Sequence, residues 1–94
     1  MTSKQRAYLR SLANRTESIL QVGKSGINEN LIKQVEDALE AREIIKLHNL
    51  ETSPLSVKEA MNQLAAATES EPVTAVGNRF VLYKESKNNK KIIL

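Results

Sequence analysis

A four-residue segment, Gly23–Gly26, combines residue types that bind anions: two glycines enclose Lys24 and Ser25. Glycine lets a phosphate approach the backbone without meeting a side chain. Lys24 supplies a positive charge and Ser25 a hydroxyl donor. A helix-like segment begins near residue 28, so the unpaired N–H groups at its start would face the same anion. The pattern therefore predicts a phosphate-binding loop.

The loop has other interpretations. A nucleotide-binding P-loop also ends in Gly-Lys-Ser, but it requires a further glycine five positions before Gly23, where this chain has Ser18. A plain turn between a strand and a helix needs no ligand, and isolated GxxG sequences often have that role. A GxxG loop also clamps the RNA backbone in KH modules, where it lies between two helices. The spacing argues against a P-loop and leaves the turn and the RNA clamp open.

Charge is distributed unevenly along the chain, although the net charge is only +3. Five basic residues and one acidic residue lie in residues 1–26, and the same numbers lie in residues 72–94. Residues 27–71 carry nine acidic and four basic residues. If the two ends meet beside Gly23–Gly26, they create a positive face suited to nucleic acid. An uneven but merely solvated surface is the alternative.

The composition is typical of one small globular domain, with 40% hydrophobic and 27% charged residues among 94. No apolar run approaches the roughly 18 residues of a membrane helix, and the N-terminus lacks a signal-peptide core, so we expect no membrane association and a cytoplasmic location. The absence of cysteine excludes disulfides and thiolate metal sites, and a single histidine cannot supply a zinc cluster by itself. No metal site and no cofactor are predicted.

Hydrophobic spacing predicts three helices and four strands. The helices are expected at Thr2–Asn14, about Asn28–Ala41 and Ser56 to near Thr68, and the strands at Ser18–Val22, Ile44–Leu50, Val73–Val76 and Phe80–Tyr83. Ser56 with Glu59 forms a capping-box pattern at the start of the third helix. Gly77 suits the first central position of a type II′ turn between the last two strands.

This order, a helix followed by β-α-β-α-β-β, predicts an α/β fold with a mixed four-stranded sheet. Strands joined through helices should be parallel, and the final hairpin must be antiparallel. The strand order does not follow from the sequence. We expect one domain at residues 1–84 and a mobile basic tail at residues 85–94, in which Ile92–Leu94 could add a short edge strand.

The first helix has an apolar face at Tyr8, Leu9 and Leu12. Arg6 and Arg10 lie away from this face, so both are expected to be free for solvent or a polyanion. The three aromatic residues, Tyr8, Phe80 and Tyr83, all have core spacing. With only 3% aromatic residues, a base-stacking sheet is not supported, and recognition should depend on phosphates and shape.

No catalytic site is predicted. His48 is expected to be an exposed strand residue, because no motif connects it to Ser25 or to a carboxylate.

The chain resembles the YhbY family, the stand-alone bacterial form of the CRM domain. The resemblance covers nearly the whole chain and rests on several separated motifs in order. These are Lys4–Arg6 with Leu9–Ala13, then Val22–Ile27, Leu39–Leu47, Val76–Gly77 and Val81–Lys84. Family members typically have arginine where Lys84 stands, and lysine keeps the charge but loses the bidentate geometry.

The resemblance implies a fold similar to the C-terminal domain of a bacterial translation initiation factor, and RNA binding without catalysis. It also implies association with large-subunit ribosomal RNA or its precursor particle and a role in its assembly. We expect the chain to be a monomer. The expected RNA-binding residues are the loop, the basic first helix and two flanking cations: Gly23, Lys24, Ser25, Gly26, Lys4, Arg6, Arg10, Arg79 and Lys84.

A second hypothesis assigns the chain to protein interaction. The exposed side of the second helix carries Glu29, Glu36 and Glu40, which could dock a basic ribosomal protein. Both activities could coexist in one domain.

Overall fold

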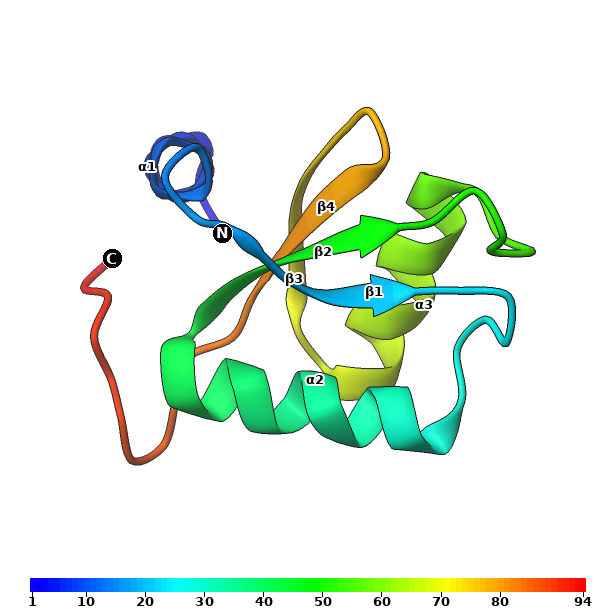
Figure 1. The fold of residues 1–94 in the computed structure, drawn as a ribbon. Coiled ribbons are helices and arrows are strands. Elements are labelled where there is room, and N and C mark those ends of the chain that lie inside the picture. Colours follow the sequence, from blue (N-terminus) through cyan, green and yellow to red (C-terminus); the bar gives the residue numbers. More distant parts are fainter.

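The structure, a computed structural model, describes residues 1–94 as three helices and a four-stranded sheet (Figure 1). The elements are α1 (Ser3–Ala13), β1 (Ser18–Val22), α2 (Glu29–Arg42), β2 (Ile44–Asn49), α3 (Val57–Thr68), β3 (Glu71–Val76) and β4 (Arg79–Tyr83). The strand order is β1-β2-β4-β3. β1 and β2 are parallel, whereas β4 is antiparallel to both β2 and β3. The predicted α/β class with a mixed four-stranded sheet is confirmed.

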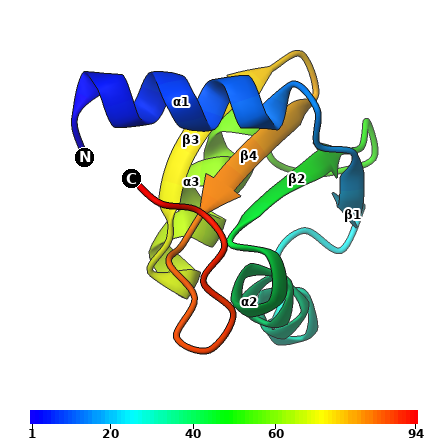
Figure 2. The same cartoon turned by 90° about the vertical axis from the view of Figure 1, so that its left-hand side faces the viewer.

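The sheet separates two hydrophobic clusters. On one face, α2 and α3 cover a cluster of 11 buried residues that includes the fully buried Leu47, Leu64 and Phe80. On the other face, α1 places Leu9 and Ala13 in a smaller cluster and crosses β3 and β4 (Figure 2). Because α1 is the only helix on that face, part of the sheet beyond its end stays uncovered.

Side-chain caps fix the starts of the helices. The Thr2 side chain accepts from Gln5 N at 3.1 Å, while Gln5 Oε1 accepts from Thr2 N at 3.0 Å. Ser56 and Glu59 form the same reciprocal pair at the start of α3, with distances of 3.1 and 3.0 Å. The capping box predicted at Ser56 is therefore confirmed, because both orphan N–H groups have side-chain acceptors.

The β3–β4 connection is a two-residue turn, since Val76 pairs with Arg79 across the hairpin. Gly77 has φ +60°, a conformation that favours glycine. This agrees with the positive φ expected at the first central position of a type II′ turn.

The aromatic residues do not all enter the core. Phe80 and Tyr83 are buried as predicted, but the Tyr8 residue is 47% exposed. The expectation for Tyr8 is wrong because α1 packs through Leu9 and Ala13, which leaves Tyr8 on its outer side.

The last ten residues are mostly exposed but are anchored to the domain at two positions, in contrast to the expected mobile tail. Ser86 and Ile92 are buried, and Ile92 joins the cluster under α1. Glu43 accepts hydrogen bonds from the backbone N–H groups of Ser86 (2.8 Å), Lys91 and Ile92 (2.7 Å). No strand forms at residues 92–94. Buried carboxylate acceptors, rather than strand pairing, hold this segment.

Candidate nucleic-acid interface

The Gly23–Gly26 segment forms a tight turn between β1 and α2. Gly26 N donates to Gly23 O at 2.9 Å, which leaves Lys24 and Ser25 exposed at the tip. Gly26 is buried with φ +66°, and a Cβ there would lie 3.3 Å from Pro54 Cγ. A Cβ on Gly23 would meet only Leu50 Cδ1, at 3.8 Å. The fold thus favours glycine at position 26, whereas position 23 has room for a side chain.

Two further loops lie at the same end of the sheet. Leu50 N donates to Val22 O at 2.9 Å, which joins the β2–α3 loop to the end of β1. Asn49 N donates to Asn78 O at 2.7 Å, which joins the hairpin turn to the end of β2. We call this region the loop end of the sheet; it comprises residues 23–26, 50–56 and 77–78.

Asn49 is a positioning residue that the sequence did not single out. It is 6% exposed, and its Nδ2 donates to Leu55 O at 3.0 Å, so it holds the loop that places Pro54 against Gly26. The alternation along β2 places Asn49 on the buried side with Ile45 and Leu47. A polar residue at such a position is the sequence feature that could have identified it.

The start of α2 contributes less to an anion site than the sequence suggested. Asn28 is the N-cap, and its side chain accepts from Leu31 N at 2.9 Å. Glu29, in the first turn, places a negative charge at the positive end of the helix dipole. The groups of the loop that remain exposed to solvent are those of Lys24 and Ser25 at its tip.

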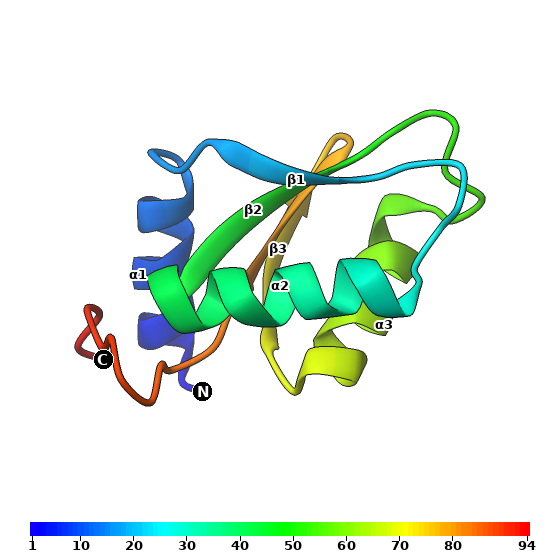
Figure 3. The same cartoon turned by 60° about the horizontal axis from the view of Figure 1, so that its bottom comes forward.

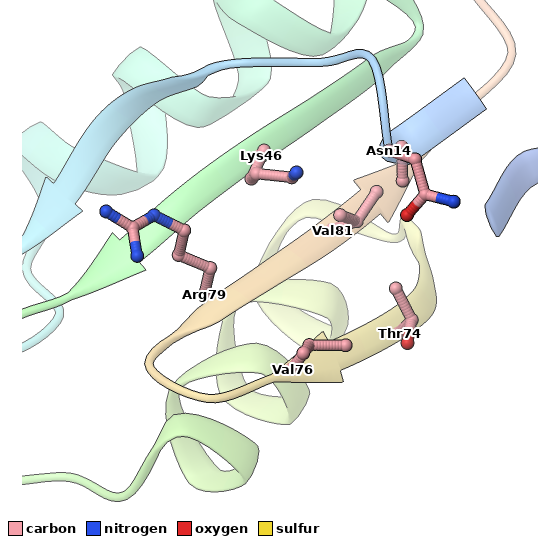
Figure 4. A pocket seen from close by; sticks show the side chains of 7 residues that line it. Asn14, Lys46, Thr74, Val76, Arg79 and Val81 are labelled. Carbon is pink, nitrogen blue, oxygen red and sulfur yellow. The ribbon is translucent and has the colours of Figure 1, made fainter. Parts of the chain in front are cut away.

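Additional cations lie on the strands next to the loop end. Arg79 is the exposed first residue of β4 and pairs with His48 of β2. Lys46 is half-buried on β2 and pairs with Val81, so it lies on the same face as Arg79 (Figure 4). The three ion pairs of the structure include neither residue, nor Lys24.

Lys46 was not among the predicted site residues. Its alternation with Ile45 and Leu47 placed it on the polar side of β2, but only the register with β4 brings it near Arg79.

Three predicted contacts lie elsewhere. Arg6 donates to Glu71 Oε1 at 2.7 Å and to Pro72 O at 2.6 Å, so the expectation that it is free is wrong. Lys84 Nζ donates to Thr68 O at 2.8 Å. Lys4 borders a surface hollow with Ile93 and Leu94.

The basic ends of the chain therefore do not gather beside the loop. Both termini lie at the end of the sheet opposite Gly23–Gly26 (Figures 1 and 3). The reason is the antiparallel pairing of β4 with β2, which places Tyr83 beside Ile44 at the start of β2. Arg10, by contrast, is exposed and takes part in none of the ion pairs.

The acidic side of α2 is partly occupied by the chain itself. Glu40 accepts from the Ser86 hydroxyl at 2.6 Å and from Asn88 N at 3.0 Å. Glu29 and Glu36 stay exposed. A basic partner docking here would find two of the three predicted carboxylates available.

No group of three or more potential ligand side chains lies close enough to hold a metal ion. None of the three helices combines the length and apolar character needed to cross a membrane.

Residues 1–84 match the model of the CRS1 / YhbY (CRM) domain. The chain belongs to the CRM domain family. It is 46% identical over 94 residues to the "Probable RNA-binding protein YqeI" of Bacillus subtilis, covering 100% of this chain and 98% of that protein. It is 26% identical over 90 residues to an "RNA-binding protein" of Haemophilus influenzae, covering 96% and 91% of the two chains. The resemblance predicted from the separated motifs is confirmed.

A solved relative has the same fold. The solution structure of the protein SAV1595 from Staphylococcus aureus is 51% identical to this CRM domain and superposes with a TM-score of 0.83. The match covers 100% of this chain and 98% of the other.

The two loop glycines should respond differently to alanine. We expect Gly26→Ala to lower the free energy of unfolding by about 1–2 kcal/mol, because an L-residue is strained at φ +66°. Gly23→Ala should change it by less than about 0.5 kcal/mol, as is usual for a surface site without special geometry. Urea unfolding of both variants measures the difference, and equal destabilisation would contradict this account of the loop.

Proposed function

We propose that this CRM domain is a non-catalytic RNA-binding protein that contacts the RNA backbone at the loop end of the sheet. The observation that carries the proposal is the exposed Lys24–Ser25 tip, enclosed by glycines and unpaired with any carboxylate. Gly23 has no packing reason to lack a side chain, and close approach of a phosphate supplies one. The names of the relatives support RNA as the partner.

The proposed contact surface is narrower than the set predicted from the sequence. It includes Gly23–Gly26, Arg79 and Lys46, and it extends toward Arg10. Arg6 and Lys84 are left out because their charged groups already bind backbone carbonyls, and Lys4 because it lies at the opposite end. Cations without protein partners are the ones that can neutralise phosphates and release counterions.

We further propose that the bound RNA belongs to precursors of the large ribosomal subunit, whose assembly the domain assists as a monomer in the cytoplasm. This part rests on the resemblance to stand-alone CRM proteins.

The rival function is protein docking through the acidic side of α2. Glu29 and Glu36 are exposed and favour it, but Glu40 is already bound by the C-terminal segment. Asp37 is also exposed on α2, but its carboxylate lies 4.0 Å from Lys33 Nζ. The remaining exposed glutamates offer a basic partner little specificity, since exposed ion pairs contribute only about 0–1 kcal/mol each.

Gradient sedimentation of cell extracts distinguishes the two functions. We expect wild-type protein to sediment partly with large-subunit precursors, and Lys24→Glu to reduce that fraction about tenfold by opposing a phosphate contact. Lys4→Glu is the matched control, because Lys4 is also exposed but lies at the end of the sheet opposite the loop.

The double variant Glu29→Lys/Glu36→Lys tests the rival. If it releases the protein from the particles while Lys24→Glu does not, the acidic side of α2 is the binding surface and the RNA proposal fails. Circular dichroism of each variant checks that the fold is intact.

A further inference from the structure

A cavity opens on the sheet where α1 ends. It has a volume of about 270 Å³ and is bordered by Ala13 and Asn14 at the end of the helix and by residues of three strands (Figure 4). Lys46, Val81 and Thr74 follow one another across β2, β4 and β3, so they form one row on the same face. The cavity is thus built on regular secondary structure.

The cavity combines cations with neutral hydrogen-bonding groups. Val81 is 2% exposed and Ala13 is 2% exposed, so they supply an apolar floor and side. Lys46 and Arg79 supply positive charge, while Asn14 and Thr74 supply an amide and a hydroxyl. No carboxylate borders it.

The other hollows of the surface have different chemistry. Three of the remaining four are bordered by at least one glutamate, and the fourth has a single lysine as its only charged residue. Two cations without an opposing carboxylate occur only in the cavity at the end of α1. This pairing favours a ligand with a negative charge.

The polar side chains of the cavity are free to bind. Neither Lys46 nor Arg79 takes part in an ion pair. Asn14 is the C-cap of α1, and its backbone N–H donates to the carbonyl oxygens of Arg10 and Leu12. Its side-chain amide takes no part in these hydrogen bonds. An amide presents both donors and an acceptor, and a threonine hydroxyl does the same. Such side chains can hydrogen-bond the edge of a nucleobase, because that edge exposes both donors and acceptors.

The cavity is continuous with the loop end of the sheet. Arg79 follows the hairpin turn and pairs with His48, next to the end of β1 where Gly23–Gly26 begins. An RNA strand that leaves the loop can therefore pass over the ends of β2 and β4 and reach Lys46.

We propose that this cavity binds one unstacked nucleotide of the RNA strand whose backbone is bound at Gly23–Gly26. Lys46, whose amine points toward Asn14, holds its phosphate, and Asn14 and Thr74 hydrogen-bond the base over the apolar floor (Figure 4). The guanidinium of Arg79 points the other way, toward the ends of β1 and β2, and holds the adjoining phosphate of the strand (Figure 4). A volume of about 270 Å³ lies near the lower limit of small-ligand sites and suits one nucleotide rather than several. The inference rests on the proposed function, since it assumes that RNA is the partner.

The test compares a single-stranded RNA of eight nucleotides with a blunt RNA duplex of the same phosphate number. We expect Asn14→Ala and Thr74→Val to weaken binding of the single strand about fivefold each, the effect of one lost hydrogen bond, and to leave duplex binding unchanged. Asn88→Ala, at an exposed position on the C-terminal segment, is the control and should match wild type. In wild type, the single strand should shift the amide NMR signals of Thr74, Val76 and Val81.

The possible outcomes separate the two proposals. If Lys24→Glu weakens RNA binding but the cavity variants and signals do not respond, the nucleotide site is wrong and the RNA function stands. If neither RNA binds wild type, both fail. Binding of adenosine monophosphate as tight as that of the single strand assigns the cavity to a free nucleotide. Signal shifts caused by an eight-residue glutamate peptide but not by RNA assign it to an acidic protein. Either result overturns the inference.

Discussion

Replacing Glu43 by alanine is expected to lower the free energy of unfolding by about 3 kcal/mol and to release residues 86–94 from α2. Glu43 is fully buried, and its carboxylate accepts from three backbone N–H groups, those of Ser86, Lys91 and Ile92. Hydrogen bonds to a charged group contribute about 1.5–3 kcal/mol each. The expected loss of unfolding free energy is smaller than the summed contributions of the three hydrogen bonds, because water can bind the N–H groups of the detached segment.

Glu43→Gln is a second variant that separates the effect of the acceptor oxygens from the effect of side-chain volume. Its side chain has nearly the same volume but one acceptor oxygen in place of two, so it should retain part of the attachment. Urea unfolding measures the stability, and hydrogen exchange of the amides of residues 86–92 measures the attachment. Wild-type stability and protection in Glu43→Ala would show that the carboxylate does not hold the segment.

The attachment should also be lost at acidic pH. The hydrogen bond from the Ser86 hydroxyl, followed by those from the backbone N–H groups of Lys87 and Asn88, lowers the pKa of Glu40 from 4.5 to about 2. Burial acts to raise the pKa of Glu43, but its three backbone hydrogen bonds outweigh burial and lower it. A carboxyl whose pKa is lower in the folded state stabilises that state above pH 4.5 and loses this effect as the pH falls. Amide protection should therefore fall between about pH 4.5 and pH 2.

Reversing two charges at the loop end is expected to reduce RNA affinity about 100-fold. The variant is Lys24→Glu/Arg79→Glu, and each change replaces a phosphate contact by a repulsion worth roughly tenfold in affinity. Effects at separate positions add when the residues share no partner. Neither side chain takes part in an ion pair, so the fold should be retained.

The control has the same change in net charge at the opposite end of the sheet. Lys4→Glu/Lys87→Glu also changes the charge by four units but should reduce affinity by less than about threefold. Equal losses in the two double variants would mean that RNA responds to net charge alone, and that the domain has no localised binding surface. Filter binding or fluorescence anisotropy measures both affinities.

The fold could be predicted because each element has a local signal. Ser56 with Glu59 marks the start of a helix, Gly77 marks a hairpin, and the alternation of Ile45 and Leu47 with Lys46 marks a strand. These patterns involve neighbours in the sequence. The strand order depends instead on long-range packing, and no residue in the chain specifies it by type.

The candidate site could be predicted only where it is local. The two glycines of Gly23–Gly26 predict the loop from neighbouring residues alone. The uneven distribution of charge along the chain does not indicate which cations lie beside that loop. Arg6 was misjudged because its partner, Glu71, is distant in the sequence and comes close only through α1 crossing β3. The residues 85–94 were misjudged for a related reason: their polar composition predicts mobility, whereas Glu43 supplies buried acceptors for their backbone.

The salt dependence of RNA affinity tests the central claim most directly, because each neutralised phosphate contributes a slope of about −0.7 in log K against log salt for single strands. We predict that Lys24→Gln/Arg79→Gln reduces the steepness of the wild-type slope by about 1.4, the contribution of two phosphates. Lys4→Gln/Lys87→Gln should leave the slope unchanged. An unchanged slope in the first variant, or the same reduction in both, would contradict binding of the RNA backbone at the loop end.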